Sequence, residues 1–568
     1  MTTTIDFEGQ LLPAVQGDSV AATLASHGIY DLRVCRSGEL RGIFCGMGVC
    51  HECLVEIDGQ PNQRACLTKV DRPMKIARQK FLAETNHATE TIRDEHIQPP
   101  EIEMPQLLVI GGGIGGISAA AAAAESGLDV ILLDDRVQLG GQFCKQPALH
   151  HKSLIQRKSD RQMKLGQDVI QRATNAGVKI VTDAQVWASF PEKDILTICG
   201  GQPRWFRPEN LVVATGAYER GLPVPGWTLP GVMTTGAAQA LLRTYRIIPG
   251  QRVLIAGNGP FNLQVALELS KAGAIVVGVA ESASRPGLNS WRALYNMYRG
   301  SRRLLLDGMR YVFQLKLKKI PIWYKHQIVS IEKSGHGLRA RLQSSAKNKG
   351  SSIDPLNIDV VCMGYGFLPS NMILRSLGCE HQFDEYRRQL VVKRSSNFET
   401  TVPNIYAVGD CAGLGGAYSA AEEGILTGIH IASTLHHAPS DKLAMEGAKS
   451  RLQLSKHKQF QSGLWKLFET SRVNTELATP ETIICRCESV KLVDISDAIR
   501  AGCVSIGEVK QRTRAGMGRC QGRYCAPILA EFMSKETQTT LAEDGFFAPR
   551  APVSPIEISK IAMFSQPD

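Results

Sequence analysis

Short apolar runs that end at glycine clusters are the main pattern along this chain of 568 residues. The clearest run is 107–110, LLVI, which leads into a glycine-rich turn and then into an alanine-rich stretch at 117–126. Another apolar run follows at 129–133. Short apolar runs bounded by turns are typical of buried parallel strands, and the alanine-rich stretch is typical of a helix. The pattern predicts a strand–turn–helix–strand unit of an α/β fold.

The three glycines of this turn have separate roles. Gly111 suits a tight turn, Gly113 lets the backbone approach a pyrophosphate, and Gly116 lets the helix pack on the strand. Asp134 ends the second strand, 23 residues after Gly111, where the hydroxyls of a ribose need an acceptor. A GxGxxG motif alone is weak evidence. Strand, glycines, helix, strand and acid in this order favour a bound dinucleotide over a turn without a ligand.

Later strand ends add groups that belong beside the same nucleotide. They are Gly141 and Gln142 in a turn after Asp134, Thr215 and Gly216 after the run 210–214, and Asp410 after the run 404–408. An acid at the last position can bond a ribityl or phosphate group, and the helix that starts near Tyr418 can point its N-terminus at a flavin. Several strand ends around one nucleotide favour FAD over NAD.

A second nucleotide-type pattern lies between the two parts of the first. The run 252–256 leads into Gly257 and Gly259, and the next apolar run ends in Glu281. An acid there accepts from a ribose 2′-hydroxyl and repels a 2′-phosphate, so NAD is favoured over NADP. Asn262 replaces the third small residue and predicts a less regular contact between helix and strand. Three alternatives stay open here: NAD, an adenine nucleotide, or an empty site.

The first cysteine group lies near the N-terminus, among glycines and short apolar stretches. Its members are Cys45, Cys50, Cys53 and Cys66. The spacing of the first three, with a fourth cysteine further on, is that of plant-type [2Fe–2S] proteins. Glycines in the loop let backbone N–H groups point at the sulfurs. A zinc site or free thiols are the alternatives, although zinc usually takes two close pairs.

A further cysteine group lies near the C-terminus, on two loops of a short helical pattern. Its members are Cys485, Cys487, Cys520 and Cys525. Four thiolates on two loops can hold a second [2Fe–2S] cluster, and zinc stays a closer rival here because paired spacings also suit it. Nearby arginines are expected to offset the charge of the cluster. These are Arg486, Arg514, Arg519 and Arg523.

Composition narrows the class of protein. The net charge of +11 is modest for this length, and the basic clusters at 316–319 and 512–514 favour solvated faces over nucleic-acid binding. No apolar run approaches a membrane span, and the N-terminus has no signal-peptide pattern. Fifteen cysteines without such a signal indicate a reducing compartment. We expect a cytoplasmic protein, with peripheral contact to the inner membrane through its electron acceptor as the alternative.

The motifs divide the chain into consecutive domains. We expect a β-rich [2Fe–2S] domain at 1–80, a linker at 81–105, an FAD-binding domain at 106–246 and 365–435, an inserted nucleotide-binding domain at 247–364, a connector at 436–480, a helical [2Fe–2S] domain at 481–535 and a tail at 536–568. The linker is polar and charged, and it predicts that the first domain can move. Only Cys144 follows Gly140 and Gly141, and the second nucleotide fold carries no CxxC, which argues against a dithiol mechanism.

This order of motifs resembles the electron-transfer subunits of bacterial heteromeric amine dehydrogenases, the hydrogen cyanide synthase, opine oxidase and proline or D-hydroxyproline dehydrogenase type. RSGELRGIFCGMGVCHEC is similar to their small ferredoxin subunit. GGGIGG, GNGP, AVGD and TRAGMGRCQGRYC are similar to their larger flavin subunit. The C-terminal group also resembles the bacterioferritin-associated-ferredoxin type, although its second pair is wider than the usual spacing. The resemblance covers nearly all of 1–535, with both subunits in one chain.

The resemblance implies a two-dinucleotide-binding-domain flavoprotein with FAD, two [2Fe–2S] clusters and a separate amine-oxidising flavoprotein as partner. It also leaves room for FMN at an interface between subunits. Electrons would pass on to an acceptor that the sequence does not identify. The sequence shows no recognisable catalytic residue for amine oxidation. The alternative function is a self-contained NADH-dependent flavin and iron–sulfur reductase.

Overall fold

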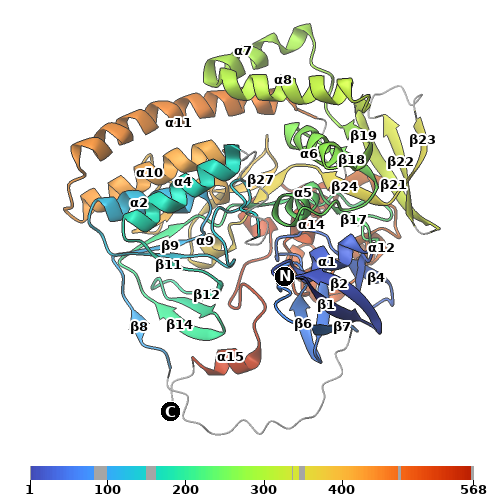
Figure 1. The fold of residues 1–568 in the computed structure, drawn as a ribbon, viewed down its shortest axis with the longest axis horizontal. Helices are drawn as coiled ribbons and strands as arrows, with labels where there is room; N and C mark the ends of the chain where they lie inside the picture. Colours follow the sequence, from blue (N-terminus) through green and yellow to red (C-terminus); the bar gives the residue numbers. More distant parts are fainter. Residues whose placement is uncertain are drawn as a thin grey trace.

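The computed structural model describes residues 2–81, 99–148, 161–335, 337–344, 352–470 and 475–564. Most of the predicted linker, 82–98, lies outside the described residues. The α/β fold class with a β-rich N-terminal domain and a helical C-terminal domain is confirmed (Figure 1).

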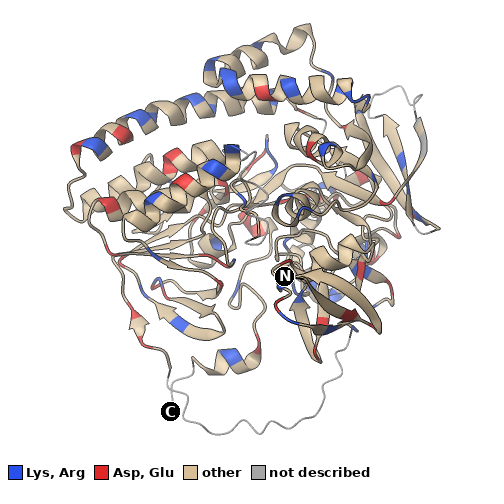
Figure 2. Cartoon of the chain, viewed as in Figure 1, with Lys and Arg blue, Asp and Glu red and all other residues tan. Residues whose placement is uncertain are grey.

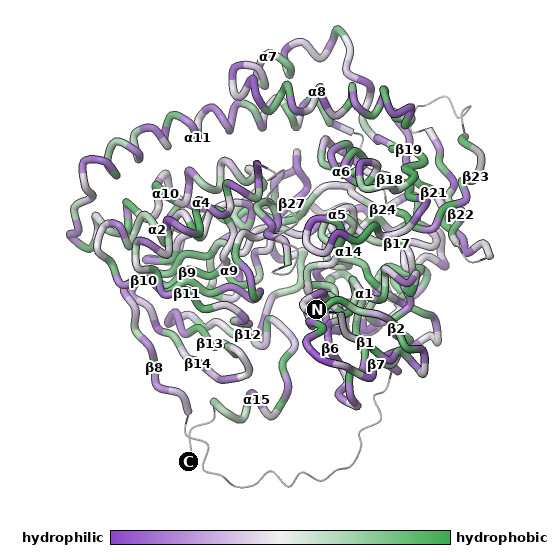
Figure 3. The backbone as a smooth tube through the Cα atoms, viewed as in Figure 1, coloured by the Kyte–Doolittle hydropathy of each residue, from purple (hydrophilic) through white to green (hydrophobic). Residues whose placement is uncertain are grey.

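Five parallel strands form the sheet that carries the first glycine motif. In spatial order they are β11 (Lys179–Val181), β10 (Val130–Leu133), β9 (Leu107–Ile110), β15 (Asn210–Val213) and β28 (Ile405–Ala407). β9 is central, and all of its residues are buried because both faces of the sheet are covered. Figure 3 shows these hydrophobic strands beneath the helices. The strand ends that the sequence predicted to meet therefore lie at one edge.

Helices cover one face of this sheet, and a mostly antiparallel sheet covers the other. The helices are α2 (Ile114–Glu125), α4 (Arg161–Asn175) and α10 (Ala417–Thr434), and the covering strands are β12 (Ala184–Ser189), β13 (Ile195–Cys199), β14 (Gln202–Phe206) and β8 (Ile102–Glu103). Small residues let α2 and α10 approach closely, since a Cβ on Gly424 would lie 2.2 Å from the carbonyl oxygen of Gly115. β8 falls within the range that we predicted as linker.

The second nucleotide fold has its own parallel sheet. Its strands are β17 (Val232–Thr234), β24 (Val360–Gly364), β18 (Arg252–Gly257), β19 (Ile275–Glu281) and β20 (Ile322–Tyr324), with helices α5 (Thr235–Tyr245), α6 (Pro260–Lys271), α7 (Trp291–Gly300) and α8 (Arg302–Leu317) and an outer antiparallel sheet of β21 (His326–Ser334), β22 (Gly337–Ser344) and β23 (Ser352–Ile358). β17 pairs with β24 although we had placed 232–234 in the first part of the FAD domain. β16 (Ala217–Glu219) and β25 (Phe367–Pro369) pair where the two folds join.

The N-terminal domain is a five-stranded sheet with one helix. Its elements are β2 (Gln10–Val15), β1 (Thr2–Phe7), β7 (Met74–Arg78), β5 (Leu54–Ile57), β6 (Gln60–Arg64), the pair β3 (Asp31–Val34) and β4 (Leu40–Gly42), and helix α1 (Val20–Ser26). This domain packs against the second nucleotide fold. Its apolar core continues into that of the second nucleotide fold. Tyr30 donates to the carbonyl oxygen of Pro249 at 2.5 Å, and Lys69 donates to the hydroxyl of Tyr245 at 2.6 Å.

The C-terminal part begins with a long helix, α11 (Asp441–Leu467), which crosses the molecule in Figure 1. The predicted connector is therefore largely one helix. The cysteine domain follows, with β29 (Ile483–Cys485), β30 (Val490–Lys491), α12 (Leu492–Arg500), α13 (Ile506–Thr513) and α14 (Cys525–Thr537). The tail then returns to the antiparallel sheet, where α15 (Ile558–Ala562) lies beside Trp187 and Val553 donates to the carbonyl oxygen of Trp187 at 2.7 Å.

Candidate functional site

A large cavity of about 1580 Å³ lies where the two nucleotide folds and the N-terminal domain meet. The residues that we predicted for FAD line it together. They are Gly111, Gly113, Asp134, Gly141, Gln142, Thr215, Gly216 and Asp410. Gly116 belongs to the helix packing beneath them rather than to the lining. Residues from four separate strand ends thus converge on one space, as a dinucleotide site requires.

The backbone of the glycine motif has the shape that a pyrophosphate needs. Gly111 has a positive φ of 114°, and a Cβ there would lie 2.4 Å from the carbonyl oxygen of Ala214. A Cβ on Gly116 would lie 2.0 Å from the carbonyl oxygen of Gly111. A Cβ on Gly113, by contrast, would meet no protein atom within 4 Å. Gly113 thus leaves open space beside the start of α2, which fits a phosphate at a helix N-terminus.

Two acids hold the loops around this space. Asp134 accepts from the backbone N–H of Gly112 at 2.6 Å and of Arg136 at 2.9 Å, and burial with nearby Asp135 raises its pKa to about 6. Asp410 accepts from the N–H groups of Gly415 and Gly416 at 2.9 and 2.8 Å, and burial raises its pKa. Both carboxyl groups lie at strand ends, where a ribose or ribityl chain is bound in this fold.

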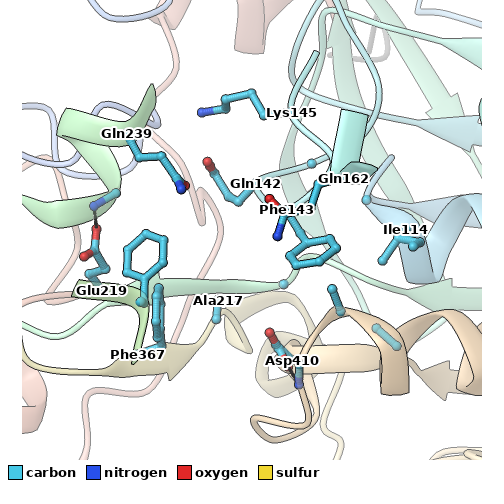
Figure 4. Close-up of a pocket in the computed structure, with 18 of the residues that line it drawn as sticks. Ile114, Gln142, Phe143, Lys145, Gln162, Ala217, Glu219, Gln239, Phe367 and Asp410 are labelled. Carbon is cyan, nitrogen blue, oxygen red and sulfur yellow. Dashed lines mark hydrogen bonds between the residues drawn. The ribbon is translucent and has the colours of Figure 1, made fainter. Parts of the chain in front are cut away.

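Other residues of the cavity were not predicted from the sequence. Figure 4 shows Lys145, Glu219, Gln239 and Phe367 around the same space as Asp410. Glu219 is buried, accepts from the N–H of a neighbouring glycine on α5 at 2.8 Å, and has a pKa raised by burial to about 8. Burial lowers the pKa of Lys145. No local motif marks these residues, because remote segments bring them together.

The second nucleotide motif is formed, and its acid bonds the glycine turn as Asp134 does in the first motif. Glu281 is fully buried and accepts from the N–H of Gly259 at 2.9 Å and from Asn258 at 3.0 Å. Asn258 also donates to the carbonyl oxygen of Phe468 at 3.0 Å, just beyond α11. Among the described residues, those that line the large cavity do not include Gly257, Gly259 or Glu281.

Asn262 does not loosen this fold. Its amide donates to the carbonyl oxygen of Gly364 at 2.9 Å, and its oxygen accepts from Thr235 at 2.9 Å. The side chain is buried and joins α6 to β24 and α5. We expected a less regular contact between helix and strand, but the structure shows a contact held by two hydrogen bonds of the Asn262 side chain.

The first cysteine quartet is buried on the wall of the flavin cavity. Cys45 lines the cavity, and the thiols form two adjacent pairs, Cys45 with Cys50 and Cys53 with Cys66. Backbone N–H groups point at two of the sulfurs, from Met47 to Cys45 and from Glu52 to Cys50, each at 3.5 Å. Two thiolates for each of two irons, with N–H donors to sulfur, is what a [2Fe–2S] cluster needs.

The second quartet has the same paired arrangement. Cys487 lies 3.2 Å from Cys520, and Cys485 pairs with Cys525. The N–H of Gly516 points at Cys485 at 3.5 Å. In the described part of the chain, no three His, Cys, Asp or Glu side chains form a group suited to one metal ion. Two adjacent pairs of thiols in each quartet fit the two irons of a [2Fe–2S] cluster.

The arginines near the second quartet differ in their partners and in their burial. Arg514 pairs with Glu488 at 3.0 Å on the surface, and Arg519 donates to Asn62 of the N-terminal domain at 2.7 Å. Arg486 is buried against the first quartet's loop. We had expected all of them to serve one cluster.

Family comparisons agree with these three sites. Residues 105–428 match the model for pyridine nucleotide-disulphide oxidoreductases, residues 1–80 match a 2Fe-2S iron-sulfur cluster binding domain, and residues 483–535 match a BFD-like [2Fe-2S] binding domain. The chain belongs to the pyridine nucleotide-disulphide oxidoreductase family and carries a [2Fe–2S] domain at each end. It is an FAD-dependent, iron–sulfur oxidoreductase. All fifteen cysteines are free thiols, so the eight members of the two quartets are available as metal ligands.

Sequence identities to individual proteins indicate a more specific relationship within the family. Hydrogen cyanide synthase subunit HcnB of Pseudomonas aeruginosa is 32% identical over 80% of this chain and 97% of its own length. One subunit of the opine oxidase of Agrobacterium tumefaciens is 29% identical over 83% of this chain and 94% of that protein. Subunit HcnA of the same synthase is 45% identical over 13% of this chain and 70% of its own length. These relatives are named as subunits, and two of them correspond to parts of this one chain.

A solved structure shows the same fold. L-proline dehydrogenase from P. horikoshii superposes with a TM-score of 0.71 at 20% identity, over 100% of this chain and 98% of that one. Within the described residues, no helix has the length and apolar character needed to span a bilayer.

Proposed function

We propose that this chain is the electron-transfer subunit of a heteromeric amine or amino-acid dehydrogenase of the glycine, opine, proline or D-hydroxyproline type. A separate flavoprotein subunit would oxidise the amine at its C–N bond. This chain would pass the electrons through FAD and two [2Fe–2S] clusters to an acceptor. The subunit names of the relatives support this proposal.

The shared cavity is the observation that carries it. Cys45 and Val49 of the first cysteine loop line the same space as Gly113 and Asp410 of the FAD site. When bound, FAD can take up electrons in pairs and release them one at a time, and a [2Fe–2S] cluster exchanges them singly. On this proposal both groups would lie on one cavity, which suits a chain that converts between the two kinds of transfer. We expect one FAD and about four irons per chain.

The hairpin of α7 and α8 supports a protein partner. It exposes large apolar side chains, with 61% of Trp291, 59% of Met309 and 62% of Phe313 accessible. Figure 2 shows that its charges are mostly basic. α8 also lines the mouth of the flavin cavity. Exposed apolar patches with a polar rim are typical of interaction sites.

An NADH-dependent reductase is the second candidate, because β18, α6, β19 and Glu281 form a complete nucleotide-type unit. Glu281 accepts from the N–H of Gly259 as Asp134 accepts from that of Gly112, so the geometry is compatible with a bound nucleotide. The subunit names of the relatives favour the first proposal. FAD in the purified chain should stay oxidised under anaerobic conditions with NADH. Rapid bleaching of the flavin by NADH would favour the reductase.

The test of the main proposal uses the pure, cofactor-loaded chain with an artificial dye. Alone it should reduce no dye with proline, hydroxyproline, glycine or an opine. The same assay on the complex recovered from its source through a tagged chain should show dye reduction with one of these substrates. Dye reduction by the pure chain with any of them would contradict the proposed role.

A further inference from the structure

A buried charged network lies where the two cysteine loops meet. Glu52 stands between Cys50 and Cys53 of the first loop and is 1% exposed. Arg486 stands between the cysteines of the second loop, 3% exposed, with its guanidinium 3.6 Å from the Glu52 carboxylate. Arg33 donates to the other carboxylate oxygen at 3.0 Å. The network therefore joins the N-terminal and C-terminal domains through residues adjacent to the thiols.

Aromatic rings fix the position of Arg486. Its guanidinium lies 3.8 Å from the ring centre of Phe44 and 4.7 Å from that of Trp227, and it donates to the carbonyl oxygen of Trp227 at 2.7 Å. Phe44 precedes the first cysteine and packs edge-on against Tyr524, with ring centres 5.2 Å apart. Tyr524 precedes the last cysteine of the second quartet. Each loop is thus held by groups of the other.

Burying charged groups costs free energy, so the charged network does more than hold the two domains together. Apolar residues of similar volume would often hold two domains as well or better, whereas paired charges accept few geometries. Removing Glu52 leaves the two buried arginines without their shared counter-charge. The network therefore specifies one register between the two loops.

We propose that Arg33, Glu52 and Arg486 are positioning residues that hold the two [2Fe–2S]-binding loops face to face, so that electrons pass between them without movement of the N-terminal domain. An electron that crosses oxidises the cluster of one loop and reduces that of the other, with no bond or proton changed. The inference rests on the proposed electron-transfer function, and it replaces the mobile domain that the linker suggested.

The test is electron paramagnetic resonance of the full, cofactor-loaded chain after reduction with dithionite. Two reduced clusters held in one register should show magnetic interaction, seen as broadened or split signals. Glu52→Gln and Arg486→Met should keep full iron content but lose this interaction, and Arg486→Lys should retain part of it. Glu481→Gln, which breaks an exposed ion pair with Lys491 in the same domain, is the matched control and should leave the spectrum unchanged.

Retention of the wild-type spectrum by both iron-replete variants would overturn the proposal, as would two non-interacting signals in the wild type. If these variants lose iron, Arg33→Met tests the same network from β3, outside both cysteine loops. It should weaken the interaction, and an unchanged spectrum would again overturn the proposal. No amine or partner is needed, so this result is separate from that of the dye assay.

Discussion

Gly113 and Gly116 have different surroundings, which predicts different effects of one added methyl group. Gly116→Ala places a Cβ against the backbone oxygen of Gly111 and should destabilise the whole domain. Gly113→Ala meets open space and should fold, but its methyl group occupies room that the pyrophosphate needs. We expect Gly113→Ala to weaken FAD binding at least tenfold, about 1.4 kcal/mol.

Flavin titration of the apoprotein and thermal unfolding monitored by circular dichroism separate these effects. Gly507→Ala is the control, since its Cβ would touch only the Ser505 hydroxyl at 3.8 Å. Unchanged FAD affinity in Gly113→Ala would contradict the assigned role.

Glu219 gives a pH-dependent prediction. Its pKa is raised by burial from a usual value of 4.5 to about 8, so the folded protein keeps a proton that the unfolded chain releases. Stability from this group is present below about pH 4.5 and is lost as the pH rises through 8. Each unit of pKa difference corresponds to about 1.4 kcal/mol. Glu219→Gln should therefore gain stability relative to wild type between pH 5 and pH 9.

Thermal unfolding across that pH range shows whether the stability of Glu219→Gln relative to wild type rises with pH, as predicted. Glu557→Gln, a surface substitution with a 63% exposed carboxylate, serves as the control. A difference between Glu219→Gln and wild type that stays constant with pH would show that the carboxyl does not titrate as its burial requires.

At the scale of elements, β29 ends at Cys485 and α14 begins at Cys525, two segments that a bound cluster would join. Cys487 and Cys520 are 33 positions apart and lie 3.2 Å from each other. Because a metal that bridges distant segments contributes its binding energy to folding, Cys520→Ser should loosen 485–535 and leave the FAD domain intact. Iron removal by a chelator should do the same.

Limited proteolysis with mass mapping follows this effect. Cys503→Ser is the matched control, because that thiol lies in the same domain outside the quartet. Equal protease resistance of 485–535 in Cys520→Ser and wild type would rule out the structural role.

Elements were predictable where their signal is contiguous. The helix expected near Tyr418 begins at Ala417, and the strand expected at 252–256 ends one residue later. We assigned β17 to the FAD domain, but it belongs to the sheet of the second nucleotide fold. A strand of three residues is too short to show a hydrophobic pattern that identifies its sheet. The docked tail was missed because Trp187, which it contacts, is hundreds of residues away along the chain.

At the scale of the whole molecule, the α7–α8 hairpin gives a prediction about assembly. Met309→Ser with Phe313→Ser should leave thermal stability unchanged, since both side chains are exposed, and should reduce the partner retained by a tagged chain at least tenfold. Met445→Ser on α11, where the side chain is 75% exposed, is the control. Full retention by the double variant would place the partner elsewhere.

The assembly of the site shows where sequence reasoning ends. Gly111 and Asp134 were predictable because one short unit contains them both. Glu219 enters the cavity only through the packing of the two nucleotide folds. The contact of Glu52 with Arg486 was equally hidden, and the polar linker pointed instead to a mobile domain. Contacts between domains depend on shape and buried charge that no single segment reveals.

The covalent union of the N-terminal domain with the rest of the chain has a consequence for concentration. A docked domain on the same polypeptide meets its site as an intramolecular event, so dilution does not separate them. The ratio of the two cluster domains is fixed at one to one, however strongly the gene is expressed. An interface within one chain also avoids the translational entropy that separate subunits lose on association. The charged network between Glu52 and Arg486 can then be kept beside the apolar part of the interface.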